Sequence, residues 1–535
     1  MTIADPARAG SHPPAAPPSG VNDALLRRLA TSSRPLATAI ERLQAMRSPF
    51  GAKPGVYALQ ETTADARPAL LAAMHRAMGG TVLVVVPTPD VAERAFADLL
   101  YYLGEDEPQT AVLLGARDEA LGAIQSPSER SARMTVLADL IDGTPRIVLA
   151  PIRAVRQYLM PRALFDELRF CLRPGDEAGW EATQERLYRL GYERSDLVSA
   201  VGEYAVRGGI LDVYPATAGA PMRVEFFGDT VESVRRFEVE SQRSNASVAS
   251  VEVVPWTEIP RDEHFRARIL ERFDGSDGAR HELATHLNSR EEVPETWLPL
   301  AFDQRATIFD YVPAGTLLVL DEPATISTVA TALDEERTRE QHVLQAALGS
   351  GELSVDETEV GEALLADVAA VHPSLEELGR AMARFPTLAV SGAIENATAS
   401  SWIAPPIETF ALACRPAEHF NRQIELFSRS VRDAVAAGET TVVVSAAVAR
   451  TTDLLQAAGV PTAPRPTPGA ATVDHGSIEA GFAVPSLRLR VLGDREIYGT
   501  PAKRVKMRAV KEGVPVTLAD LRVGDHVVHA VHGLG

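Results

Sequence analysis

The stretch Leu187–Gln242 most constrains what this chain can fold into, because it places three short apolar runs between strong turn signals. The runs are Tyr204–Val206, Gly209–Tyr214 and Arg223–Phe227. Each has the length and the apolar pattern of a β-strand, and Gly, Pro and Asp residues separate them. The stretch therefore predicts a small antiparallel β-module, which is too short to be stable unless a neighbour covers its apolar face. Composition alone would favour an ordinary β-insert that has no partner.

The residues of this module are more specific than its pattern. The segments GYERSDLV, GEYAVRGGILDVYPA and MRVEFFGDTVESVRRFEVESQRS follow one another within it. They resemble the inserted domain shared by the excision-repair protein UvrB and the bacterial transcription-repair coupling factors (Mfd). In that family the insert docks UvrA, so the resemblance implies that residues 166–255 form a UvrA-binding β-module.

The same resemblance implies two arginines as UvrA contacts. Arg194 and Arg207 are thirteen residues apart, which is the separation of two arginines with which the UvrB insert grips UvrA. The family arginine two positions before Arg207 is replaced by Ala205, which predicts weaker binding. Strand alternation places Ala205 and Arg207 on one face, and Tyr204 and Val206 on the other face, in the module's core. The alternative is that both arginines are solvated surface charges.

Length and composition limit the classes of protein that remain. The 535 residues argue for three or more domains, and 45% hydrophobic with 23% charged residues is typical of soluble globular protein. A net charge of −19 disfavours binding to bare nucleic acid. The two cysteines, Cys171 and Cys414, suit a reducing cytosol, and no apolar run is long enough for a membrane span. We therefore expect a cytoplasmic protein with no membrane partner, whose residues 1–22 form a disordered tail.

Apolar strands that alternate with helices follow this tail. Strands are expected at Val56–Leu59, Thr81–Val86, Thr110–Leu114 and Arg146–Ala150, with helices at Ala64–Met78, Asp90–Leu103 and Pro127–Ile141. This alternation predicts a parallel sheet that is covered on both faces. The segment SPSERSARMTVLADLIDGTPRIVLAPIRAVRQYLMP resembles the first domain of the coupling factors. Residues 23–165 and 256–348 are accordingly predicted to form one UvrB-like α/β domain, which the β-module interrupts.

The phosphate-binding residues of a P-loop are missing from this domain. A P-loop needs glycines for its turn and a lysine on the phosphates. The first strand is instead followed by ETTADARPALL, and no lysine occurs between Lys53 and Lys503. The segment LLVLDEP resembles a Walker-B strand, but without a P-loop we interpret Asp321 and Glu322 as capping carboxylates and not as a magnesium site. The sequence therefore predicts no cofactor and no catalysis in this stretch.

A further small α/β domain is expected at 385–499, after a linker at 349–384 that contains an acidic loop. Its predicted strands are Thr387–Ser391, Thr440–Ser445 and Arg488–Leu492, and its predicted helices are Phe420–Ala437 and Ala447–Ala458. The segment VLGDREIYGT resembles the end of the coupling factors' third domain. No catalytic or metal-ligand constellation can be read from the spacing of its residues, and His475 is assigned to a loop.

The last residues combine a basic segment with the beginning of another module. Residues 500–516 are interpreted as a basic linker, with phosphate contacts as the alternative; their charges are Lys503, Arg504, Lys506, Arg508 and Lys511. The segment LADLRVGDHVVHAVHGLG resembles the opening of the RNA-polymerase-interacting module of coupling factors. A small β-barrel is therefore expected to begin near 517. His529 and His532 are interpreted as strand residues of that module and not as metal ligands. Because the resemblance stops within its first strands, we expect this chain to be a fragment of a longer protein.

These observations together predict an α/β, multidomain chain that resembles the N-terminal part of a coupling factor. It would contain a degenerate P-loop-type parallel sheet, an inserted antiparallel β-module, a further small α/β domain and the start of a small β-barrel. The resemblance implies that the whole protein binds the beta subunit of RNA polymerase stalled at DNA damage and displaces the polymerase by ATP-driven translocation on double-stranded DNA. It would also recruit UvrA for transcription-coupled nucleotide-excision repair, and this stretch would be the docking and regulatory platform. ATP and magnesium would be held by motor domains outside this stretch.

Two alternative functions are consistent with parts of the sequence. An active UvrB-type excision-repair helicase subunit would need a P-loop and an aromatic-rich β-hairpin, and neither can be found in the sequence. A free-standing adaptor that binds UvrA would need only the β-module and its supporting domain.

Overall fold

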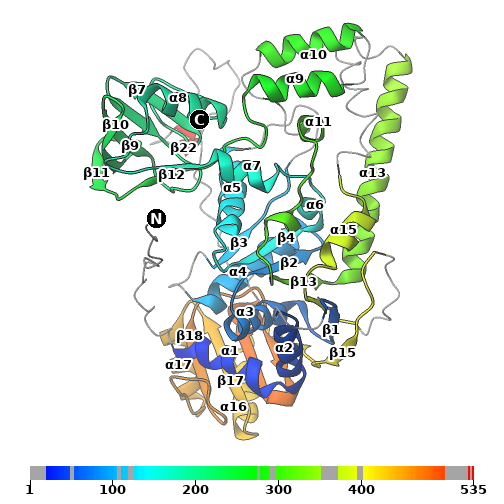
Figure 1. Ribbon diagram of the computed structural model, residues 1–535. Helices are drawn as coiled ribbons and strands as arrows, with labels where there is room; N and C mark the ends of the chain where they lie inside the picture. Colours follow the sequence, from blue (N-terminus) through cyan, green and yellow to red (C-terminus); the bar gives the residue numbers. More distant parts are fainter. Residues whose placement is uncertain are drawn as a thin grey trace, which may run out of the picture. The chain divides into compact units, whose positions relative to one another are not determined.

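The computed structural model describes most of the chain (Figure 1). The described residues are 20–47, 53–104, 110–117, 126–273, 277–289, 293, 297–350, 372–393, 402–499, 528–529 and 533–534. Two compact units are distinguished, residues 1–503 and residues 504–535.

The centre of the first unit is a seven-stranded sheet in which every pair of neighbouring strands is parallel. Its strand order is β15-β1-β14-β13-β2-β4-β3. The strands are β1 (Val56–Gln60), β2 (Val82–Val86), β3 (Ala111–Leu113), β4 (Ile147–Pro151), β13 (Leu317–Asp321), β14 (Thr387–Val390) and β15 (Glu408–Ala411). The four expected strands before the β-module are present, and the predicted parallel sheet is confirmed.

Strand β14 corrects one expectation. Thr387–Ser391 was assigned to the further α/β domain, but Thr387–Val390 lies between β1 and β13 in the seven-stranded sheet. A four-residue apolar run does not indicate which sheet it joins, because any buried parallel position accepts such a run. The long helix α13 (Pro323–Ser350), which separates it in sequence from β13, made the assignment to a later domain plausible.

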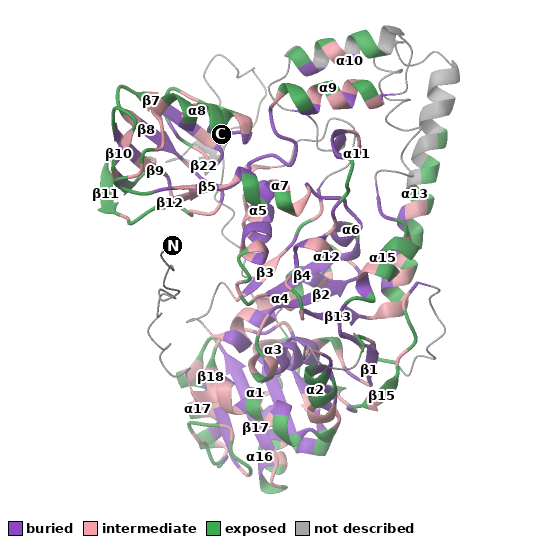
Figure 2. Cartoon of the chain, viewed as in Figure 1, coloured by how far each residue is buried: buried purple, intermediate pink, exposed green. Residues whose placement is uncertain are grey.

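Helices cover the two faces of this sheet, and alternate residues of each strand face opposite sides. Val82, Val84 and Val86 pack with α1 (Gly20–Ser32), α2 (Arg34–Arg47), α3 (Arg67–Met78) and α4 (Pro89–Leu103). Leu83 and Val85 pack with α5 (Pro127–Ile141), α6 (Ile152–Val155), α7 (Arg162–Leu168) and the first half of α13. Strands β1, β2, β4 and β13 are consequently buried on both faces, as Figure 2 shows.

The β-module enters after α7 and contains a six-stranded sheet of order β11-β10-β9-β8-β7-β6. Its elements are β5 (Phe170–Leu172), α8 (Trp180–Arg189), β6 (Glu193–Arg194), β7 (Glu203–Arg207), β8 (Ile210–Val213), β9 (Met222–Phe227), β10 (Thr230–Phe237), β11 (Ser244–Ser247) and β12 (Val251–Val253). The pairs from β7 to β11 are antiparallel, whereas β6 runs parallel to β7. The three predicted apolar runs are therefore β7, β8 and β9. Their inward side chains, such as Leu211 and Val224, join the same apolar cluster as α5, so the first domain supplies the cover that the module needs.

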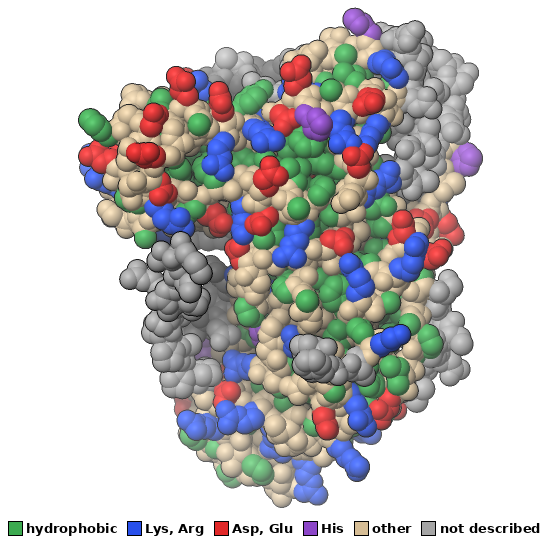
Figure 3. Space-filling model, in the orientation of Figure 1, with side chains coloured by type: hydrophobic (Ala, Val, Ile, Leu, Met, Phe, Trp, Pro, Cys, Tyr) green, Lys and Arg blue, Asp and Glu red, His purple; other side chains and the backbone are tan. Residues whose placement is uncertain are grey.

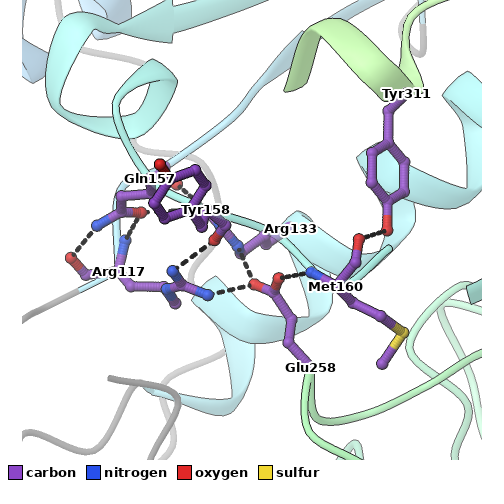
Figure 4. A network of polar contacts seen from close by, with 8 residues as sticks. Arg117, Arg133, Gln157, Tyr158, Met160, Glu258 and Tyr311 are labelled. Carbon is purple, nitrogen blue, oxygen red and sulfur yellow. Dashed lines mark hydrogen bonds and ion pairs between the residues drawn. The ribbon is translucent and has the colours of Figure 1, made fainter. Parts of the chain in front are cut away.

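A buried polar network fixes both ends of the module to the first domain (Figure 4). Glu258, in the returning segment, is fully buried, and its Oε1 accepts hydrogen bonds from Arg117 Nη1 and Arg133 Nε, both at 2.9 Å. Its Oε2 accepts the amide of Met160, in the segment that leads into the module, at 3.0 Å. Burial alone would raise the pKa of Glu258, but the two guanidinium groups and the amide outweigh it and lower the pKa. Glu258 is therefore held as a carboxylate that joins the entering and returning segments.

The further α/β domain has a five-stranded sheet of order β16-β19-β20-β17-β18. It consists of β16 (Arg415–Pro416), α16 (Ile424–Ala436), β17 (Thr440–Ser445), α17 (Val448–Ala457), β18 (Ala471–His475), β19 (Phe482–Val484), β20 (Leu489–Gly493) and α18 (Asp494–Tyr498). Val442 and Val444 of β17 face the cluster formed by α1 to α4, and Val443 faces α16. His475 ends β18 and is exposed, so its assignment to a loop was wrong.

The remaining described elements are mostly short. They are η1 (Ala64–Ala66), α9 (Glu263–Arg272), α10 (Asp277–Ser289), α11 (Leu298–Ala301), α12 (Ile308–Tyr311), α15 (Leu375–Met382) and η4 (Pro485–Leu487). In the second unit, β21 (Val528–His529) pairs with β22 (Gly533–Leu534). Within the described ranges no helix combines the length and the apolar character needed to cross a membrane. The predicted α/β class with an inserted antiparallel module is confirmed.

Candidate functional site

Arg194 and Arg207 lie on the two neighbouring strands at one edge of the module's sheet. Arg194 is in β6 beside Tyr204, and Arg207 ends β7 opposite Ile210. Both side chains are exposed, and Arg207 Nη2 donates to the carbonyl oxygen of Asp196 at 2.8 Å. The structure therefore brings the two predicted arginines to one edge of the sheet with their charges accessible.

The register places these arginines on opposite faces of the sheet. Tyr204 and Val206 face the main apolar cluster, as predicted from strand alternation. Side chains of paired residues on adjacent strands share a face, so Arg194 leaves the sheet on the side of Tyr204. Arg207 leaves it on the other side, with Ala205. The separation of thirteen residues thus gives proximity along the edge but not a common face.

The face that carries Arg207, here called the outer face, has a covered end and an open end. At the covered end, Ala205 is 1% exposed and packs with Val198 and Phe237. Next to Ala205, Arg223 donates to both oxygens of Asp212, at 2.7 and 2.8 Å. Ala205 itself is therefore not accessible to a partner at this end.

The open end combines Arg207 with an exposed aromatic ring. Strand alternation in β9 places Phe227 on the outer face with Glu225, whose strand neighbour Ile210 pairs with Arg207. Phe227 stands at the β9–β10 turn and is 82% exposed, the highest value for a large hydrophobic side chain among the described residues. The sequence contained a signal that went unused: Phe226 and Phe227 are adjacent in a strand, so only one of them can face the core.

Charged side chains of both signs surround this module. On the face shown in Figure 3, Lys and Arg side chains are interspersed with Asp and Glu among the residues drawn in colour. On the outer face itself, Glu225 accepts a hydrogen bond from Ser233 at 2.6 Å and lies 3.6 Å from Arg235. A partner of this face would therefore be selected by particular contacts and not by a broad field of one sign.

An arginine occupies the carboxyl ends of the strands in the seven-stranded sheet, which is where a P-loop protein would bind its nucleotide. Arg67, the first residue of α3, forms ion pairs with Asp321 and Glu322, which follow one another at the end of β13. Its Nε also donates to Thr62 Oγ1 at 3.1 Å, in the connection after β1. Glu322 accepts the amide of Gly392, after β14, at 2.9 Å.

Both carboxylates at the end of the Walker-B-like strand are therefore engaged in ion pairs with Arg67. Burial raises the pKa of Asp321 while the guanidinium of Arg67 opposes that shift, and Asp321 itself is only 8% exposed. Asp321 and Glu322 are thus counterions of Arg67, a pairing that the sequence did not predict. Arg67 was missed because 254 residues separate it from Asp321.

The other predicted functional residues are less completely placed. His529 lies in β21, opposite Gly533 of β22. His532, the basic segment 503–511 and the acidic loop of residues 352–359 lie outside the described residues. In the part of the chain that the structure describes, no group of three His, Cys, Asp or Glu side chains is arranged to hold a metal ion.

A comparison with protein families identifies the module. A family model described as the UvrB interaction domain matches residues 170–258, which run from β5 through Glu258. The module is therefore similar to the UvrB interaction domain over its whole length.

Relatives extend the similarity beyond the module. The transcription-repair-coupling factor of Bacillus subtilis (strain 168) is 27% identical over 445 residues, which is 77% of this chain and 36% of that protein. That of Staphylococcus epidermidis (strain ATCC 35984) is 25% identical over 476 residues, 83% of this chain and 38% of that protein. That of Staphylococcus aureus (strain USA300) is 22% identical over 492 residues, with shares of 88% and 41%. The resemblance to the N-terminal part of a transcription-repair coupling factor is confirmed, and the chain spans little more than a third of the length of these relatives.

Proposed function

We propose that this chain is the UvrA-docking part of a transcription-repair coupling factor and that the open end of the module's outer face contacts UvrA. The observation that carries the proposal is that Phe227 and Arg207 are both exposed on one face of the same sheet, two strands apart. Aromatic residues and arginines are both enriched at the centre of protein interfaces. The match to the UvrB interaction domain and the names of the relatives support the choice of an excision-repair partner.

The energetics favour a small number of strong contacts. Covering Phe227 removes apolar surface from water, and the ring is available without any change in the fold. Arg207 already donates to the Asp196 carbonyl, which limits the conformations that its side chain would lose on binding. Truncation of an interfacial arginine that becomes desolvated typically costs about 2–5 kcal/mol of binding free energy. Arg194, on the opposite face of the same edge, would contact UvrA only if UvrA wraps around the edge.

The activity of the whole protein is part of the same proposal. Like the coupling factors that it resembles, the protein would couple transcription to repair. It would bind the RNA polymerase beta subunit through the module that begins near Thr517, and displace the polymerase by ATP-driven translocation on double-stranded DNA. ATP and magnesium would be bound by motor domains outside this stretch. Arg67 supports this division, because its ion pairs occupy the sheet edge at which a UvrB-type helicase subunit would hold phosphates.

Titration of purified UvrA with variants of the module tests the docking proposal. We expect Arg207→Ala to weaken binding by at least about tenfold and to leave the melting temperature unchanged, because the side chain is exposed. Arg194→Ala is expected to have the same effect if both sides of the edge are covered. Arg243→Ala is the matched control, since Arg243 is also exposed but adjoins β11, at the opposite edge of the sheet. Equal affinities of the wild type and the Arg194→Ala/Arg207→Ala double variant would place the docking surface elsewhere.

A further inference from the structure

The contact between α4 and the further α/β domain contains a buried carboxylate. Asp98 of α4 is 4% exposed, and its Oδ1 accepts the amide of Glu479, in the loop between β18 and β19, at 2.7 Å. One turn further along α4, the Tyr101 hydroxyl donates to Asp474 Oδ2 of β18 at 2.9 Å. The two hydrogen bonds link one helix of the first domain to the further domain at the carboxyl end of its β18 strand.

The rest of this contact is closely packed. A Cβ atom added to Gly476 would lie 2.4 Å from a ring carbon of Tyr101, so the backbone of the further domain rests directly on that ring. Helix α1 adds two hydrogen bonds from Arg28, to Thr440 Oγ1 and to the carbonyl oxygen of Leu487, both at 2.6 Å. Water therefore has little access to Asp98 while the contact is closed.

The groups that face Asp98 are mainly acidic. The connection after β1 contributes Asp65 from η1, and the further domain contributes Glu479 and Glu496. The nearby Arg495 is already engaged, since it pairs with Glu479 at 3.1 Å, and the His419 ring lies 3.9 Å from Glu496. On α4 itself the neighbouring hydroxyl of Tyr102 is uncharged and fully buried. The closed contact therefore surrounds Asp98 with more negative than positive charge.

The burial and the acidic neighbours of Asp98 change how tightly its carboxyl group binds a proton. Burial, together with the carboxylates of Glu479, Asp65 and Glu496, raises the pKa of Asp98 to about 7, although the amide of Glu479 opposes the shift. If the contact opened, the same side chain would be hydrated and its pKa would return to about 3.9. The closed state thus binds a proton more tightly than the open state does.

We propose that the contact between α4 and the further α/β domain is a proton-linked clasp, in which protonation of Asp98 favours the closed state and its ionisation favours opening. The direction follows from linkage. A carboxyl group that holds its proton better in the closed state stabilises closure at low pH and loses that contribution as the pH rises toward 7. Well above pH 8 no further change is expected, because Asp98 is then ionised in both states. This device is independent of the UvrA-docking proposal and concerns a domain to which the sequence assigned no role.

Hydrogen exchange of the full chain at pH 6 and pH 8 measures the clasp directly. After correction for the intrinsic exchange rate, we expect the opening equilibrium of residues 471–499 to be roughly tenfold more favourable at pH 8, given a pKa near 7 when closed and about 3.9 when open. Asp98→Asn keeps the acceptor for the Glu479 amide and removes the charge, so its opening should be the same at both pH values. Glu479→Gln removes a neighbouring charge and should shift the transition to lower pH.

Asp90→Asn is the matched control, because Asp90 is an exposed aspartate in the first turn of the same helix. That variant should retain the tenfold change of the wild type. An equal change with pH in Asp98→Asn and in the wild type would overturn the proposal, and so would a wild-type opening equilibrium that does not change between pH 6 and pH 8.

Discussion

The outer face of the module and the carboxyl end of the seven-stranded sheet each contain an arginine at or near a strand end, but one arginine is exposed and the other is buried. Arg207 is the last residue of β7, the strand next to the edge strand β6, and it is exposed on the same face as Phe227. Arg67 follows β1 and is buried, with Asp321 and Glu322 as counterions. The difference teaches that an arginine is available to a partner where it is exposed, and that a buried arginine is held by the carboxylates around it.

Glu258→Ala should cause the largest loss of stability, because Glu258 is fully buried and is the counterion of two buried arginines. The variant leaves Arg117 and Arg133 in a dry site without their carboxylate, and breaking a buried ion pair costs about 3–5 kcal/mol. Chemical denaturation should show this loss of unfolding free energy. Glu263→Ala, an exposed carboxylate five residues further on, should change stability by less than about 0.5 kcal/mol. A loss below about 1 kcal/mol for Glu258→Ala would mean that the network does not hold the module in place.

Arg67→Ala comes next and addresses the sheet edge itself. Asp321 and Glu322 would face each other without a cation, and we expect a loss of about 3 kcal/mol, at the lower end of the range because Glu322 is partly exposed. Arg67→Lys should lose less, since lysine keeps the charge but lacks the planar fork that reaches both carboxylates. UvrA affinity should be unchanged in both variants. Loss of UvrA binding in a stable Arg67→Ala protein would reverse the roles assigned to the two regions.

Phe227→Ala should act on binding alone. Removal of an interface anchor costs at least about 2 kcal/mol, which corresponds to roughly thirtyfold weaker binding of UvrA. The melting temperature should not fall, because the ring is 82% exposed in the free protein. Leu197→Ala is a suitable comparison, as Leu197 is also exposed, at 42%, but precedes β7. A similar loss in both variants would extend the docking surface beyond the open end of the outer face.

The smallest expected effect concerns the binding of ATP. Because Arg67 occupies the sheet edge, titration of a fluorescent ATP analogue up to millimolar concentration should give no saturable binding. Saturable binding that disappears in Asp321→Asn would show that the edge still accepts a nucleotide.

Much of the architecture could be predicted from local pattern, whereas the sites depended on distant pairings. Alternating apolar residues and turn glycines were sufficient for β7, β8 and β9, since those signals lie within the strands themselves. The placement of β14 could not be predicted, because a short apolar run fits any buried position in a parallel sheet. The contact of Arg67 with Asp321 and that of Arg133 with Glu258 join residues 254 and 125 positions apart, and no periodicity links such residues.

Only part of the candidate docking site could be predicted from the sequence. The resemblance identified Arg194 and Arg207 as candidates, and the structure finds both exposed at one edge. Their positions on opposite faces follow from the parallel pairing of β6 with β7, which spacing alone does not reveal. Phe227 was missed because two adjacent phenylalanines end this strand, and the structure shows that Phe227, on the face of Glu225, is the exposed one.

The central claim is that the open end of the outer face is the UvrA-docking surface, and the Arg207→Ala/Phe227→Ala double variant tests it most directly. Calorimetric titration of UvrA into the wild type, the double variant and Arg243→Ala should be accompanied by melting curves of all three proteins. We predict that the double variant binds at least about a hundredfold more weakly with an unchanged melting temperature, and that Arg243→Ala matches the wild type. Wild-type affinity in the double variant would contradict the claim.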